Sequence, residues 1–270
     1  MRHRGFTLIE LMIAIVMLAV LATALTRILL ADSRFVSQQE ALITARQTAR
    51  AATNVMNVEL RMVSDSGLLA ASADSVYFRS PYAYGMACGA SGGERIISLM
   101  PTDSAMYASA IPGGIARRTA LGFSFHGGIT VATSANLATC TADSVRVVPD
   151  GFLAAVTPDT TASSGELVYL YQDVAFRYMP STDMPGRIGL WRRVGAGAYE
   201  ELAAPFDSTA RFRFLVGPNL LRTDTPPVDL TTVNGLELSI MAQSYEPPRG
   251  RTQYQTFDLP VQVVFLNKGN

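Results

Sequence analysis

The sequence predicts an α+β protein in which one long N-terminal helix packs against an antiparallel β-sheet domain. Residues 6–25 form an apolar run, and no proline or glycine interrupts the chain between Gly5 and Gly67. After Gly67 the pattern changes to short alternating segments separated by Gly, Pro, Asp and Ser, which is typical of strands and turns. We therefore divide the chain into a basic N-terminal segment (1–5), a membrane half of the helix (6–31), an amphipathic half (32–66) and a β-rich domain (67–270).

The apolar run is long enough to cross a membrane. About 20 residues from Phe6 to Leu25 span about 30 Å as a helix, which matches the hydrocarbon core of a bilayer. Two arginines precede the run and two follow it at some distance, so the positive-inside rule favours a cytoplasmic N-terminus without proving it. These arginines are Arg2, Arg4, Arg27 and Arg34. We expect a single-pass inner-membrane protein whose C-terminal domain lies in the periplasm.

Glu10 is the unusual residue of this run. A carboxylate inside a membrane span costs several kcal/mol and indicates a function and a partner. A secretory signal peptide would have a shorter apolar stretch and a small-x-small cleavage site. A plain signal anchor would explain the length of the run but not Glu10.

The segment Gly5-Phe6-Thr7-Leu8-Ile9-Glu10 resembles the cleavage and methylation motif of type IV prepilins and type II secretion pseudopilins. The resemblance implies that a prepilin peptidase cuts after Gly5 and methylates the new amine of Phe6. It also implies that Glu10 pairs with the Phe6 amine of a neighbouring subunit, since a buried carboxylate is tolerable when a cation neutralises it. The partners are then prepilin peptidase, other pilins or pseudopilins through the N-terminal helix, and the inner membrane; the final location is a pilus or pseudopilus filament.

The helix is expected to continue beyond the membrane with one apolar stripe. The stripe repeats every seven residues and comprises Phe35, Leu42, Ala49, Met56 and Val63, with Ala45 and Ala52 beside them. Gly67 is predicted to be the left-handed residue that ends the helix. The resemblance to pilins implies this shape, a helix half in lipid and half packed on a globular domain.

The β-rich domain contains eight predicted strands. They are residues 75–79, 144–148, 167–171, 175–179, 190–194, 211–216, 236–240 and 257–265. Pro260 predicts an edge strand or a bulge. Residues 86–141, rich in small side chains, are expected to be mostly loop, as are 223–229 and 246–251. The strand order of about the last 110 residues resembles PilW-type minor pilins and the related J-type minor pseudopilins, and the chain length favours the former.

The two cysteines, Cys88 and Cys140, both follow the membrane segment. This favours one disulfide in an oxidising periplasm, worth roughly 4 kcal/mol in the chain-entropy model. Two unpaired buried thiols are the alternative.

No catalytic residues, cofactor, metal or small-molecule substrate are expected, so the protein is not predicted to be an enzyme. Residues 89–93 match the Gly-x-Ser-x-Gly pattern of a nucleophile elbow, but the required strand before and helix after are not expected there. His126, the one histidine after residue 5, is expected in a loop and cannot complete a zinc site with two distant cysteines. Asp224 and Asp229 are too few for a calcium ligand set.

The charges argue against nucleic acid as a partner. Lys and Arg total 22, as do Asp and Glu, so there is no basic excess. A basic stripe would have to use Arg192, Arg193, Arg211, Arg213 and Arg222, which alternate between strand faces. Trp191 with Arg192 and Arg193 is either part of the core or a contact patch. The expected function is a minor type IV pilin that primes assembly or forms a pilus tip; the alternatives are a J-type pseudopilin and a tip-exposed adhesin or DNA-uptake pilin.

Overall fold

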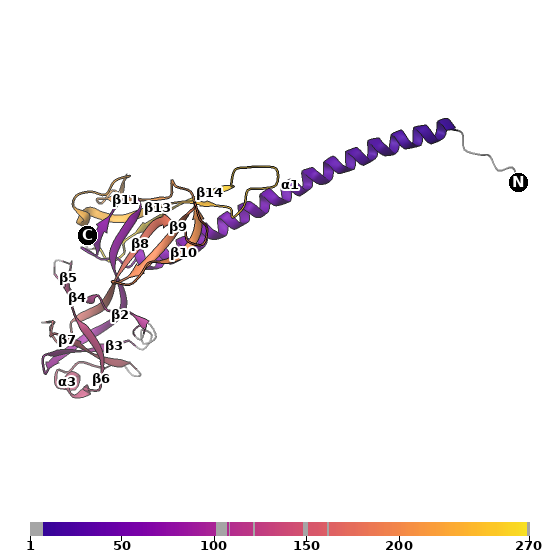
Figure 1. Ribbon diagram of the computed structural model, residues 1–270. Coiled ribbons are helices and arrows are strands. Elements are labelled where there is room, and N and C mark those ends of the chain that lie inside the picture. Colours follow the sequence, from indigo (N-terminus) through magenta and orange to yellow (C-terminus); the bar gives the residue numbers. More distant parts are fainter. Residues whose placement is uncertain are drawn as a thin grey trace.

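The computed structural model describes residues 8–100, 107, 109–120, 122–147, 151–160 and 162–268. It confirms the α+β architecture. One helix, α1 (Leu8–Leu60), begins outside the globular part and continues into it, where it meets a large antiparallel sheet (Figure 1). The absence of proline and glycine over the whole of α1 explains why the helix is continuous.

The remaining elements are β1 (Leu68–Ala71), β2 (Ser75–Ser91), β3 (Glu94–Leu99), β4 (Gly114–Thr119), β5 (Gly122–Gly127), β6 (Thr130–Ser134), α3 (Leu137–Ala142), β7 (Phe152–Thr157), β8 (Leu167–Pro180), β9 (Ile188–Val194), β10 (Glu200–Phe206), β11 (Arg211–Val216), β12 (Leu221–Thr223), η2 (Leu230–Thr232), β13 (Val233–Gln243) and β14 (Thr256–Val264). The strands form one sheet in the order β12-β11-β13-β10-β9-β8-β2-β3-β7-β6. In addition, β14 pairs with β13, β1 with β2, and the β4–β5 hairpin with β8.

The sheet has two lobes, and two long strands, β2 and β8, run from one lobe into the other. β2 and β8 pair from Ser75 opposite Arg177 to Met86 opposite Leu167. The proximal lobe contains α1, β1, β9–β14 and the near ends of β2 and β8, and the distal lobe contains their far ends with β3–β7 and α3 (Figure 1). Each lobe has its own apolar core, so the distal lobe is an addition to the helix-packed sheet.

The proximal core lies between α1 and one face of the sheet. The buried helix residues are Ala41, Ala45, Thr48, Ala49, Ala52, Met56 and Leu60. Four of these are alanines, whose small side chains let the helix backbone approach the phenylalanines of the sheet, which include Phe78, Phe176, Phe212 and Phe214.

The predicted stripe is therefore confirmed in its second half only. Ala45, Ala49, Ala52, Met56 and Val63 are buried. Phe35 is 60% exposed and Leu42 is half-buried, so the prediction was wrong for these two. For Phe35 the reason is that the buried part of α1 begins only at Ala41.

The end of α1 also differs from the prediction. The helix stops at Leu60, and Ser66, not Gly67, has the positive φ of 57°. The next three residues satisfy helical carbonyls locally: the amides of Arg61, Met62 and Val63 donate to the carbonyls of Asn57, Glu59 and Leu60. The C-terminal part of the chain then bonds to this turn: the amide of Leu266 donates to the carbonyl of Arg61 at 2.9 Å, and the side-chain amide of Asn267 donates to that of Met62 at 3.0 Å.

Most predicted strands of the proximal lobe are confirmed, and three further strands were missed. Residues 167–171 and 175–179 belong to one strand, β8, and the expected strands after residue 188 correspond to β9, β11, β13 and β14. Among the described strands, β14 pairs with β13 alone, so Pro260 lies in an edge strand as predicted. The predicted loop at 246–251 is confirmed, and the one predicted at 223–229 is confirmed except for Thr223, which ends β12. β1, β10 and β12 were not expected.

The distal lobe corrects the largest error. Residues 86–141 are not mostly loop, because they contain the end of β2, then β3–β6 and α3. β2 continues through Pro81 with a shift of register before Ala83, which accommodates the missing amide. Residues 144–147 form no strand. Gly92 and Gly93, with φ of 62° and 85°, form the tight turn from β2 to β3, so the 89–93 motif lies on a hairpin.

Candidate functional site

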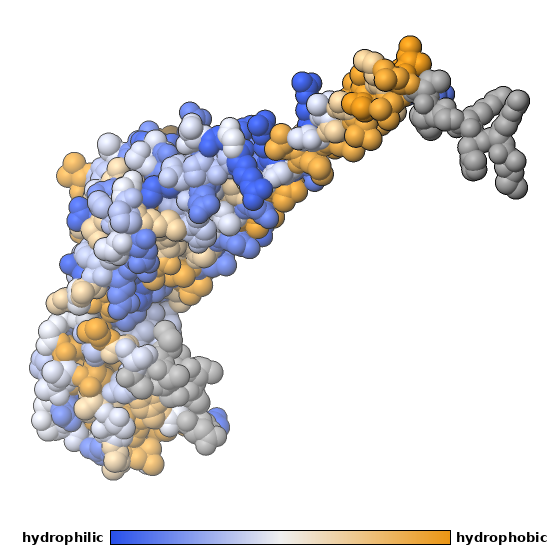
Figure 2. All heavy atoms as spheres, turned by 45° about the vertical axis from the view of Figure 1, so that its right-hand side comes forward, coloured by the Kyte–Doolittle hydropathy of each residue, from blue (hydrophilic) through white to orange (hydrophobic). Residues whose placement is uncertain are grey.

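The membrane half of α1 presents apolar side chains on every face. Each large apolar residue from Leu8 to Leu30 is more than half exposed. Figure 2 shows this part of α1 as a continuous apolar surface that projects from the polar domain. The helix is long and apolar enough to cross a membrane. A surface of this kind is stable in lipid or against other apolar helices, and not in water.

Glu10 lies in the first turn of this helix and is exposed among apolar neighbours. The partial positive charge of a helix N-terminus favours a carboxylate at this position. Farther along, the hydroxyls of Thr23 and Thr26 donate to the carbonyls of Val20 and Ala22, both at 2.8 Å, so the helix satisfies them itself. Glu10 is the single charged residue between residues 8 and 26.

Gly5 and Phe6, the predicted cleavage and methylation residues, lie outside the described part of the chain. The pairing of Glu10 with a neighbour's Phe6 amine therefore stays a prediction. The structure shows where Glu10 lies: near the start of α1, whose first 30 or so residues extend beyond the β domain.

A charged contact fixes the other end of α1 to the sheet. Glu59 in the last helical turn and Arg192 on β9 form an ion pair with a closest approach of 2.8 Å. Burial raises the pKa of Glu59 above its ordinary value, and the hydrogen bond and charge of Arg192 oppose the shift. The sequence interpretation missed this residue. The signal was its spacing, since Glu59 is three residues after Met56 in the buried stripe, but its partner is far away in sequence.

Cys88 at the end of β2 and Cys140 in α3 form a disulfide, the pair that the sequence predicted. Both residues are buried in the distal lobe, where they belong to a small apolar cluster with Ile96 and Leu153. The bridge attaches α3 to the sheet, and Figure 1 shows α3 far from the first half of α1.

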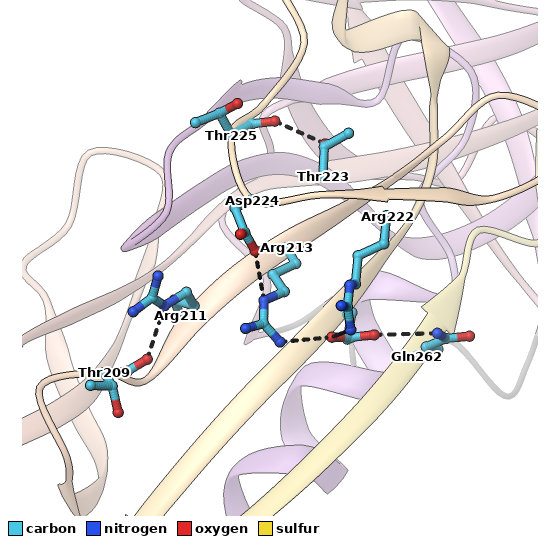
Figure 3. A network of polar contacts seen from close by, with 9 residues as sticks. Thr209, Arg211, Arg213, Arg222, Thr223, Asp224, Thr225 and Gln262 are labelled. Atoms are coloured by element: carbon cyan, nitrogen blue, oxygen red, sulfur yellow. Dashed lines mark hydrogen bonds and ion pairs between the residues drawn. The ribbon is translucent and has the colours of Figure 1, made fainter.

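The five arginines considered as a basic stripe do not form one. Arg213 and Arg222 both bind the buried carboxylate of Glu237, at 3.0 and 3.3 Å, and Arg211 donates to the carbonyl of Thr209 (Figure 3). Arg192 faces α1, and Arg193 lies over the ring of Tyr199 at 4.9 Å. These five arginines therefore make contacts within the domain and do not form one basic surface.

The other candidate residues have structural roles. Asp224 binds Arg213 at 2.8 Å, and Asp229 accepts hydrogen bonds from the amide and hydroxyl of Thr231 at the start of η2. His126 lies in β5 and not in a loop, with its Nε2 3.4 Å from the hydroxyl of Ser124. Trp191, on β9, is half-buried.

Residues 1–26 match the family model described as the prokaryotic N-terminal methylation motif. No curated protein and no solved structure is significantly similar to the chain. The match covers the basic segment, Gly5, Phe6 and Glu10, and most of the exposed apolar part of α1.

Proposed function

We propose that this chain, a member of the type IV prepilin and pseudopilin family, is a minor pilin that primes pilus assembly or forms the pilus tip. The observation that carries the proposal is the methylation motif at residues 1–26, continuous with an exposed apolar helix whose one early charge is Glu10. The chain inserts in the inner membrane through α1, and prepilin peptidase removes residues 1–5 and methylates Phe6.

Assembly then follows from the electrostatics of the helix. In lipid an isolated carboxylate is costly, and so is an isolated ammonium, but the two together neutralise each other. When apolar helices pack side by side in a filament, Glu10 of one subunit receives the methylated amine of another. The pair selects both the partner and its axial register.

The distal lobe supports a minor role over that of a repeating subunit. It stands away from α1, has its own apolar core and is stabilised by the Cys88–Cys140 disulfide. Every repeat of a helical filament would have to accommodate this additional volume, whereas a subunit at the end of a filament has free space around it. The same features suit a J-type pseudopilin, which is the alternative. An adhesin or DNA-uptake pilin gains no support from the five arginines considered as a basic stripe, which bind carboxylates or a backbone carbonyl or lie over a tyrosine ring.

The test compares Glu10→Ala with Glu40→Ala, an exposed glutamate of α1 beyond the membrane half. Each variant is expressed with the native filament machinery, and its abundance in membranes is compared with that in sheared filaments. Glu10→Ala should insert normally. Its incorporation should fall about a hundredfold or more, because breaking a buried pair costs about 3–5 kcal/mol. Glu40→Ala should behave as wild type.

The proposal of an assembly contact is falsified if Glu10→Ala and wild type enter filaments equally at equal membrane levels. Deletion of the gene separates the two subfamilies. Loss of surface pili with normal protein secretion supports the minor pilin, and loss of secretion with normal pili supports the pseudopilin.

A further inference from the structure

The loop between β13 and β14 follows α1 toward its N-terminus (Figure 1). Its tip contacts the helix where α1 leaves the domain: the amide of Arg249 donates to the hydroxyl of Ser37 at 3.0 Å, and its Nη1 donates to Ser33 at 2.8 Å. Pro248 is buried, whereas Arg249 and Arg251 are exposed. The tip, residues 248–251, is therefore fixed to the helix while its two arginines remain accessible to solvent.

Arg34 extends this cationic surface onto the helix. Gly250 has φ of 77°, and a β-carbon added there would lie 3.3 Å from Nε of Arg34, so the loop backbone runs directly beside this guanidinium. Arg27 is seven residues earlier and hence on nearly the same side of the helix. We call Arg27, Arg34, Arg249 and Arg251 the arginine collar.

Carboxylates do not neutralise the collar. None of its four arginines forms an ion pair with a carboxylate of the residues that the structure describes, whereas the arginines of the sheet commonly do. Asp32 points away from Arg27 and Arg34 by about 140° and 160° around the helix, at 100° per residue. Glu40 and Glu246 line a groove farther toward the C-terminal end of α1, together with Ala41 and Thr44.

The height of the collar along α1 indicates its ligand. The exposed large apolar side chains of the first half of α1 continue to Leu30, with Arg27 among them. Ser33 and Ser37 are about 4–10 Å farther along at 1.5 Å per residue. The head-group layer outside the hydrocarbon core is about 5–7 Å thick on each side. With Leu30 at the edge of the hydrocarbon core, the Ser33 contact of the loop thus lies at the level of the phosphates and the Ser37 contact just outside it.

We propose that the arginine collar binds the phosphate groups of anionic phospholipids in the leaflet from which the domain emerges. The proposal rests on the membrane insertion proposed above. Guanidinium groups bind phosphate through paired, charge-assisted hydrogen bonds. Because the tip is attached both to α1 and to the sheet, lipid bound there holds the β domain close to the membrane surface. Release of these lipids then accompanies extraction of the subunit into a filament.

The experiment uses the full chain in nanodiscs of phosphatidylcholine with or without added phosphatidylglycerol. Native mass spectrometry counts the lipids retained by wild type, by an Arg34→Ala/Arg251→Ala variant, and by Arg118→Ala, an exposed arginine of the distal lobe. Wild type and Arg118→Ala should retain phosphatidylglycerol selectively. The double variant should lose about 25-fold in apparent affinity, since each arginine near an anionic surface contributes about a factor of five. Hydrogen exchange of residues 249–252 should be slower on anionic nanodiscs than on neutral ones in wild type, and should not change in the double variant.

Insertion is checked separately by flotation and resistance to alkaline extraction. Insertion with equal phosphatidylglycerol retention in all three proteins overturns the lipid site and leaves the proposed function intact. Failure of wild type to insert overturns both. Loss of selectivity in Arg118→Ala as well shows that total charge, and not the collar, attracts the lipid.

Discussion

Arg192 donates two hydrogen bonds to one carboxylate oxygen of Glu59, from Nε at 3.0 Å and from Nη2 at 2.8 Å. The two side chains are 23% and 18% exposed, so the pair is largely removed from water. The ion pair joins the last turn of α1 to β9. It therefore helps to hold the helix in a fixed orientation relative to the sheet.

We predict that Glu59→Ala and Arg192→Ala each lower the free energy of unfolding by about 1–3 kcal/mol, because each leaves a poorly solvated charge without its partner. The double variant should lose less than the sum of the two. Chemical unfolding of the detergent-solubilised chain measures all three. Arg177→Ala is the control, because its ion pair with Asp74 is 3.6 Å long and about half exposed, and should cost under about 0.5 kcal/mol. Strict additivity of the first two variants would contradict the pairing.

The buried carboxylate of Glu237 should produce an acid-dependent stability. Burial alone would raise its pKa, but hydrogen bonds from Arg213 and Gln262 and the charge of Arg222 lower it below the ordinary 4.5. Ionised Glu237 therefore stabilises the fold above about pH 4.5, and this contribution is lost as the pH falls through the folded-state pKa. The stability difference between wild type and Glu237→Gln should shrink from neutral pH to about pH 3.

Glu59 provides a control, because its contribution to stability should change with pH in the opposite direction. Because burial raises its pKa, its contribution is fully present below the ordinary 4.5 and declines as the pH rises through the folded-state pKa. The difference between wild type and Glu59→Gln should change in the opposite direction over the same titration. Parallel changes for the two variants would show that neither carboxylate is responsible.

Processing should remove residues 1–5. Mass spectrometry of the membrane-purified protein should find a chain that begins with N-methylated Phe6. A Gly5→Val variant should keep its leader, because a branched side chain at the cut site prevents the extended backbone from entering the peptidase. An intact Met1 in wild type, or cleavage after residue 22 or later, would be incompatible with the motif's proposed role.

Removal of the disulfide should affect the distal lobe alone. A Cys88→Ser/Cys140→Ser variant should lose about 2–4 kcal/mol of stability. Hydrogen exchange should quicken in α3, whose contacts are with β2 and β3, and stay unchanged in α1. Peptide mapping of oxidised protein should recover the linked pair, and free thiols on both residues would refute the bridge.

The sequence determined the features that depend on local pattern. The absence of helix breakers predicted the continuity of α1, and alternation predicted the strands around Phe212, Leu238 and Val261. The motif at Gly5, Phe6 and Glu10 predicted, without any structure, the methylation motif that residues 1–26 match. The two cysteines could be paired because no other cysteine competes.

Features set by distant contacts were not predictable. Leu266 and Asn267 bond to the turn that follows α1, about 200 residues away in sequence, and no local signal reveals that contact. The strand predicted at 75–79 is only the start of β2, because the shift of register opposite β8 lets the strand continue through Pro81. The small residues of the distal lobe concealed its strands, because their alternation is weak where both strand faces are covered.

The return of the chain to the end of α1 also affects the timing of biosynthesis. Leu266 and Asn267 are made about 200 residues after Leu60, which takes roughly 10–40 s of translation. During that interval Ala49, Met56 and Leu60 have no completed sheet to cover them, because β13 and β14 are still absent. The nascent chain therefore exposes a second apolar stripe, C-terminal to the apolar first half of α1, until the last strand is made.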